Sequence, residues 1–163
     1  MKYKIDRQSP TGQQLFALYD KMNECRKAAQ VICQEVGSTS VVTSGEVIAG
    51  GIWGFEFPDK PNDYKRVYSH GARHFFFPKA LRKFEDLLKR IRRLPVVQKT
   101  DINQIVGFER QAVGTAWVRS VGCHWRKGYC LIDINEKCVY TPRPDMIEIT
   151  TTEFNRLKDE TDE

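Results

Sequence analysis

The chain has 163 residues, of which 40% are hydrophobic and 11% aromatic, a composition typical of a folded globular domain and not of a disordered chain. No apolar stretch approaches the roughly 18 residues that a membrane span requires, and the N-terminus lacks the apolar segment of a secretory signal. The formal net charge is +5, and an odd number of widely spaced cysteines favours reduced thiols, so we expect a cytoplasmic protein without membrane contact.

The first predicted element is a long core helix. Ser9 is suited to cap it and Pro10 to occupy its first turn. Apolar residues then recur on one helical face until Gly37, which is suited to end the helix. Because Cys25 and Cys33 belong to this apolar face, we expect both thiols to be buried and inert.

Residues 38–57 predict a β-hairpin with its turn at Ser44-Gly45. The pair Gly50-Gly51 indicates a bulge or a close approach of another backbone. Since glycine leaves room beside the main chain, this pair near Trp53 is a candidate place for a ligand to approach.

A second, basic helix is predicted after an exposed loop at residues 58–72. The stretch RHFFF, residues 73–77, is typical of a short buried strand or of the entry to a helix. Pro78 begins the helix and Pro95 ends it, and the apolar and polar residues of 79–93 separate onto two faces. The helix is therefore amphipathic.

The last third of the chain is mostly strand. Before it, Asp101 is suited to cap a short turn that Gly107 ends. After it, Thr151 or Thr152 is suited to cap a C-terminal helix. The alternating pattern predicts one strand at 112–125, a turn at 126–128, a strand at 129–135, a turn at 135–137, a strand at 138–142 and an edge strand at 145–150.

Together these elements predict an α+β fold in which an antiparallel sheet packs against the long N-terminal helix and the basic amphipathic helix. We expect one domain, residues 1–163, whose acidic tail frays from about residue 156. A homodimer formed through an exposed strand edge is compatible with this arrangement.

Charge is concentrated in one segment, because residues 60–93 hold eleven basic and three acidic side chains. Glu85 and Asp86 each precede a basic residue by four positions, which is ordinary surface pairing. Other cations of the helix lack such a partner within it. They would be neutralised by the phosphates or carboxylates of a ligand. The alternative is that this face of the helix is simply exposed to solvent. These cations are Lys79, Arg82, Lys83, Arg92 and Arg93.

Aromatic residues interleave with cations in the preceding segment. Such a mixture is what base stacking and phosphate contact require. It predicts a surface that binds a nucleotide or a nucleic acid. The candidate ligand-binding residues are Tyr64, Arg66, Tyr68, Arg73, His74, Arg82, Lys83, Lys89, Arg90 and Arg93.

Metal binding is disfavoured. His70 and His74 are four positions apart, but Gly71 between them argues against one helical face. Zinc sites present close cysteine pairs, which are missing among the C-terminal thiols. We expect buried reduced thiols, and a zinc site is the alternative. Cys123 and Cys130 flank the predicted turn at 126–128 and could face each other across the strands. The residues concerned are Cys123, His124, Cys130 and Cys138.

An enzymatic role is also disfavoured, because no recognised catalytic or nucleotide-binding motif occurs. Cys123 and His124 are adjacent, so a strand would point them to opposite faces and prevent a nucleophile–base contact. We expect no catalytic residue, no cofactor and no resident metal.

Two stretches, IAGGIWGFEFPDKP and PDMIEITTTEFNRL, resemble small uncharacterised proteins encoded by phages and prophages. The resemblance implies no site residue. It implies a setting in the host cytoplasm, where such proteins bind and block host components, including immune effectors or their nucleotide signals. The leading hypothesis is a non-enzymatic protein that binds an anionic ligand. The alternative is an inhibitor of a host protein with an acidic face, and the third is an enzyme with a Cys/His site.

Overall fold

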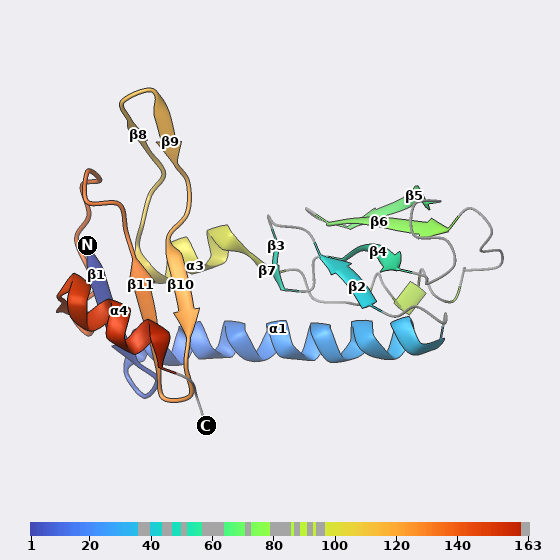
Figure 1. The fold of residues 1–163 in the computed structure, drawn as a ribbon, viewed down its shortest axis with the longest axis horizontal. Coiled ribbons are helices and arrows are strands. Elements are labelled where there is room, and N and C mark those ends of the chain that lie inside the picture. Colours follow the sequence, from blue (N-terminus) through green and yellow to red (C-terminus); the bar gives the residue numbers. More distant parts are fainter. Residues whose placement is uncertain are drawn as a thin grey trace. The chain divides into compact units, whose positions relative to one another are not determined.

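The computed structural model describes residues 1–35, 40–43, 47–49, 52–56, 64–70, 73–78, 86, 89–90, 93 and 97–160. These residues form helices and mainly antiparallel strands, which confirms the predicted α+β class (Figure 1). The chain divides into two compact units. Unit 1 is Met1–Leu18 with Lys99–Glu163, and unit 2 is Tyr19–Gln98. The single domain predicted from the sequence stays a prediction.

Helix α1 (Pro10–Glu35) begins where the sequence predicts. The hydroxyl of Ser9 accepts a hydrogen bond from the amide of Gly12 at 3.1 Å, which satisfies one of the free N–H groups of the first turn. Leu15 and Met22 of the predicted apolar face are 0% and 2% exposed. The side chains of Cys25 and Cys33, and the predicted end at Gly37, lie outside the described residues.

Unit 1 contains a four-stranded antiparallel sheet in the order β10-β11-β1-β12. Its N-terminal strand was not predicted, although Tyr3 and Ile5 alternate with charged residues and are 3% and 0% exposed. This strand pairs with two C-terminal strands, so the sheet joins the two ends of the chain. The strands are β1 (Lys2–Asp6), β10 (Gly122–Trp125), β11 (Tyr129–Asp133) and β12 (Ile147–Ile149).

The central strand β11 is covered on both faces, and its residues Cys130, Leu131 and Ile132 are each 0% exposed. On one face, Leu131 packs with Phe154 and Leu157 of helix α4 (Thr151–Asp159). On the other face the first part of α1 approaches the sheet, where the Phe16 and Trp125 rings of unit 1 lie 5.5 Å apart. Burial on both faces explains why this strand is almost continuously apolar.

The cap of α4 is one residue earlier than predicted. Thr150, not Thr151 or Thr152, accepts a hydrogen bond from the Glu153 amide at 3.1 Å. The helix also continues beyond residue 156, where the sequence predicted fraying, because Leu157 is buried in the core.

Two further predictions in unit 1 need correction. The strand predicted at 112–125 is a hairpin of β8 (Gln111–Val113) and β9 (Ala116–Val118) followed by the separate β10, because Gly114 has a φ of 63° and turns the chain. The segment at 138–142 is no strand. There the Gln111 side chain donates to the Val139 carbonyl and accepts from its amide, at 2.6 and 2.9 Å, in place of a ladder.

Helix α3 (Lys99–Val106) begins before Asp101, which lies in its first turn and is not the cap. Gly107 ends the helix as predicted and has a φ of 74°, a conformation that glycine adopts without strain.

Unit 2 contains a four-stranded sheet in the order β2-β4-β6-β5 and a separate pair of β3 with β7. The predicted hairpin of residues 38–57 is confirmed in that its first arm, β2, pairs antiparallel with the end of its second arm, β4. The residues that follow Ser44-Gly45 do not take part in this pairing, because β3 pairs with β7. The β4–β6 pair is parallel, an exception to the predicted antiparallel sheet. The strands are β2 (Ser40–Thr43), β3 (Val47–Ala49), β4 (Ile52–Glu56), β5 (Tyr64–His70), β6 (Arg73–Pro78) and β7 (Val97–Gln98).

The loop predicted at residues 58–72 contains strand β5, whose tyrosines and valine favour extended backbone. The stretch RHFFF is a strand that extends to Pro78. Most of the basic helix predicted at 79–93 lies outside the described residues. Within it, 86 and 89–90 are helical, and the amide of Arg93 donates to the Arg90 carbonyl at 3.2 Å in a turn.

Candidate functional site

The pairing of β5 with β6 brings half of the predicted ligand-binding residues into one ladder. Arg66 and Tyr68 lie opposite phenylalanines of β6, and the register shifts by one residue between them. We call these two paired strands the β5–β6 ladder. Its Cα partners include Tyr64↔Pro78, Arg66↔Phe76, Tyr68↔Phe75, Ser69↔His74 and His70↔Arg73.

The ladder stands at the border of the described sheet, because β5 is the last strand in the order β2-β4-β6-β5. An outer strand has one side of its main chain outside the sheet, and charged side chains are commonly placed there because they discourage edge-to-edge aggregation. Lys65 and Arg66 of β5 therefore occupy an outer strand, where positive charge can serve either to prevent aggregation or to bind a ligand.

The remaining candidates come from the basic segment that follows β6. Lys89 and Arg93 are exposed, and Arg90 is half-buried and already engaged with other groups. Arg82 and Lys83 lie outside the described residues, as does the glycine pair at 50–51. The structure thus places five candidates together in the ladder, and three others in helical or turn backbone further along unit 2.

The two histidines considered as a metal pair lie on adjacent strands. His70 pairs with Arg73 and His74 with Ser69, so they occupy neighbouring rungs and not one helical face. In the part of the chain that the structure describes, no group of three or more His, Cys, Asp or Glu side chains is arranged to hold a metal ion.

The C-terminal thiols are arranged on the strands of unit 1. The Cys123 and Cys130 sulfurs lie 2.9 Å apart, which confirms that these two residues face each other across the turn. Cys138 is buried, at 7% exposure, but it lies in a turn and not on the strand that was predicted for it. All three are free thiols.

His124 lies on the other face of β10. Its ring is 5.8 Å from that of Phe154, while Cys123 contacts Cys130. Burial, followed by the nearby charges of Lys158 and Arg126, lowers the pKa of His124 below its ordinary value. The two neighbours therefore form no nucleophile–base pair, as their alternation along the strand predicted.

Comparisons of the chain with protein-family models, with curated proteins and with solved structures find no match. Among the helices that the structure describes, none has the length and apolar character needed to cross a membrane.

Proposed function

We propose that this chain is a non-enzymatic binding protein whose ligand carries phosphate groups and a base, as nucleotides and nucleic acids do. The binding surface is the β5–β6 ladder together with the basic segment 79–93. The observation that carries the proposal is the pairing of β5 with β6, which puts two tyrosines, two arginines and one histidine on adjacent strands. These residues are Tyr64, Arg66, Tyr68, Arg73 and His74.

The chemistry of these side chains supports the proposal. Arginine presents a planar fork of donors that matches phosphate oxygens, and tyrosine offers a rigid ring on which a base stacks. Residues 60–93 hold eleven basic and three acidic side chains, so this segment attracts anions strongly although the whole chain carries only +5.

The proposed setting is the cytoplasm of a bacterial host, where a phage-encoded protein would sequester a nucleotide signal or a nucleic acid and so counteract host defence. The second candidate is an inhibitor of a host protein with an acidic face. The border position of β5 favours that candidate, because an outer strand can pair with a partner's backbone while its Lys65 and Arg66 meet the acidic face.

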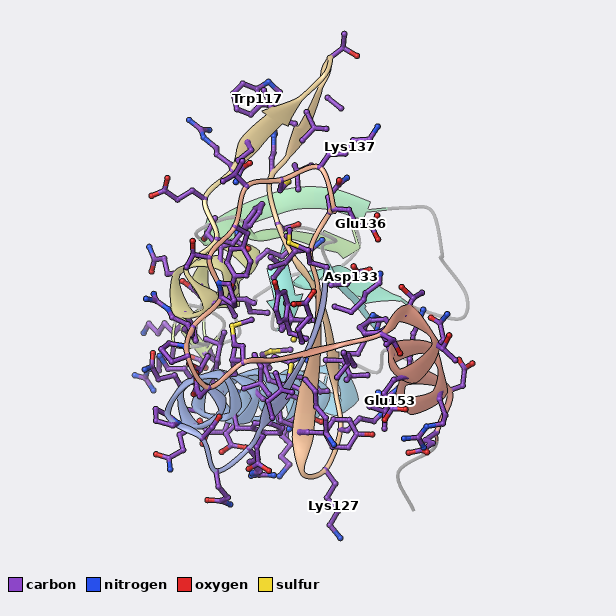
Figure 2. The ribbon with its side chains drawn as sticks, turned by 90° about the vertical axis from the view of Figure 1, so that its left-hand side faces the viewer. Trp117, Lys127, Asp133, Glu136, Lys137 and Glu153 are labelled. Carbon is purple, nitrogen blue, oxygen red and sulfur yellow. The ribbon has the colours of Figure 1, made fainter. Side chains whose placement is uncertain are left out.

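The test compares two double variants that change the net charge equally. Arg66→Glu with Arg73→Glu alters the β5–β6 ladder. Lys127→Glu with Lys137→Glu alters two exposed positions in unit 1, which Figure 2 labels. Fluorescence anisotropy measures binding of a labelled single-stranded oligonucleotide and, separately, of a labelled mononucleotide, while circular dichroism verifies that both variants fold.

We expect the ladder variant to bind on the order of tenfold more weakly or worse, because each charge-assisted hydrogen bond contributes about 1.5–3 kcal/mol. With the oligonucleotide, the salt dependence should also flatten by roughly 0.7 in log–log slope for each phosphate that the variant no longer neutralises. The control variant should bind as the unchanged chain does.

Binding of the mononucleotide alone would identify a pocket ligand, and binding of the oligonucleotide alone would identify an extended nucleic acid. Equal affinities for the two folded double variants would refute the ladder as the binding surface. If the unchanged chain binds neither probe, the proposal fails, and co-purification of an acidic protein would support the inhibitor in its place.

A further inference from the structure

The contact between Cys123 and Cys130 is independent of the proposed ligand surface, since both residues belong to unit 1. The sulfurs are 2.9 Å apart and both residues are free thiols. In the register of β10 and β11, Cys123 is opposite Ile132 and Cys130 is opposite Trp125. The two thiols are therefore diagonal neighbours, two positions apart, and their side chains turn toward each other.

The two thiols differ in their access to solvent. Cys130 is 0% exposed, whereas Cys123 is only partly buried. Burial, together with the hydrogen bond to Cys123, raises the pKa of the Cys130 thiol well above its ordinary value. A reagent from solution can reach Cys123, but it meets neither an accessible nor an ionised sulfur at Cys130.

We propose that Cys123 and Cys130 form a reversible redox pair in which Cys123 reacts first with a low-molecular-weight disulfide and Cys130 resolves the adduct. The Cys123 thiolate attacks one sulfur of the reagent, forms a mixed disulfide and releases one thiolate. The Cys130 sulfur then attacks the Cys123 sulfur while its proton passes to the departing reagent sulfur, so the intramolecular disulfide forms and the second half of the reagent leaves as a thiol. Two protein thiols are oxidised, and one reagent disulfide is reduced to two thiols.

The contact between the two sulfurs favours this second step. A disulfide bond is about 2.05 Å long, so the two sulfurs need to approach by less than 1 Å from their present contact. Diagonal residues of neighbouring strands are usually about 7–8 Å apart at Cα, which is slightly beyond the usual range for a disulfide, so closure draws β10 and β11 together locally.

Other thiols provide an internal control. Cys138 is almost as buried as Cys130, but its backbone amide is held in a turn by the Asn135 carbonyl and it is not part of the 2.9 Å contact. Trypsin, which cleaves after lysine and arginine, places each of the five cysteines in a different peptide. Cys123 falls in residues 120–126 and Cys130 in residues 128–137.

The experiment uses the full folded chain. It is incubated with oxidised glutathione, the remaining thiols are alkylated, and the tryptic digest is analysed by mass spectrometry. The expected product is a disulfide that links peptide 120–126 to peptide 128–137 and that disappears after treatment with dithiothreitol. Cys138 should be unmodified by glutathione and carry no link. This result needs no variant, so it does not depend on whether a substituted chain folds.

Two substitutions test the order of events. Cys130→Ser should stop the reaction with glutathione attached to Cys123, and Cys123→Ser should leave Cys130 unmodified in the folded chain. A glutathione adduct that persists on Cys123 of the unchanged chain, links to Cys138, or no reaction at either thiol would overturn the proposal. None of these results bears on ligand binding, so the two proposals can fail separately.

Discussion

Replacing Asp145 with asparagine should destabilise the protein, because this carboxylate holds the first turn of α1 in unit 1. One carboxylate oxygen accepts a hydrogen bond from the Thr11 amide and the other accepts one from the Thr11 hydroxyl, each at 2.6 Å. Thr11 is 6% exposed, so water does not readily replace these bonds. The interaction joins residues 134 positions apart in the sequence.

The size of the effect follows from what asparagine retains. The amide oxygen of asparagine still accepts from the Thr11 amide, and its nitrogen can donate to the Thr11 hydroxyl, but neither bond is then assisted by a charge. The loss of that assistance costs about 1 kcal/mol for each bond, and the loss of a negative charge beside a helix N-terminus costs about 0.3–1 kcal/mol. We therefore expect Asp145→Asn to lower the free energy of unfolding by about 2–3 kcal/mol.

The effect should depend on pH. Burial opposes ionisation of Asp145, but the hydrogen bonds from Thr11 outweigh it and lower the pKa of the carboxyl below its ordinary value. A group whose folded pKa is lowered stabilises the protein above its unfolded pKa, which is about 3.9, and this contribution is lost as the pH falls through the folded pKa. The difference between the unchanged chain and Asp145→Asn should accordingly shrink below about pH 4.

Urea denaturation followed by circular dichroism measures these differences, with Glu136→Gln as a control that removes one charge from an exposed turn. Thr11→Val removes the hydroxyl donor with little change of shape. In a double-mutant cycle, Thr11→Val and Asp145→Asn should couple by more than about 0.5 kcal/mol. Additive effects, or a loss no larger than that of Glu136→Gln, would refute the reasoning.

Two further predictions concern unit 1. The Tyr140 hydroxyl donates to the Val106 carbonyl at 2.5 Å, and burial raises the pKa of Tyr140 to about 12. Its contribution to the free energy of unfolding is therefore present below about pH 10 and is lost as the pH rises through 12. Tyr140→Phe should cost about 1 kcal/mol at neutral pH and reduce the alkaline loss of stability measured by denaturation; an unchanged alkaline profile would contradict this. Leu131→Ala should cost about 2–5 kcal/mol by the same assay, whereas Ile147→Ala, at a position that is 60% exposed, should cost less than about 0.5 kcal/mol. Similar losses for the two would show that Leu131 is not packed as described.

Local patterns predicted the elements that local chemistry controls. Ser9 and Pro10 mark the start of α1 because a cap and a fixed φ act within one turn, and Gly107 ends α3 because it adopts a positive φ. The hairpin of β10 and β11 was also predicted, since its loop is short and both arms are apolar. Such signals need no information about distant residues.

Pairing between distant segments was not predicted. Strand β1 has only five residues, and its alternation acquires meaning only when Lys2 pairs with Asp133 near the other end of the chain. In the same way, β3 pairs with Val97–Gln98 and not with its neighbour across Ser44-Gly45. The sequence Ser44-Gly45 favours a turn, but contacts between distant segments determined which strand β3 pairs with. Among the candidate ligand residues, Tyr64, Arg66 and Tyr68 were predicted from composition alone, because their segment was taken for a loop and its pairing with β6 was not foreseen.

The redox pair depends on register in a way that composition cannot reveal. The Arg126 amide donates to the Tyr129 carbonyl at 2.9 Å and closes a two-residue loop, which sets Trp125 opposite Cys130. Cys123 then falls on the same face of the sheet as Cys130, two positions away. A shift of the pairing by one residue would move one thiol to the opposite face, since the side chains of a strand alternate. The two thiols would then lie on opposite faces of the sheet and could not react with each other. The proposed redox pair therefore depends on the tight loop as well as on the two cysteines.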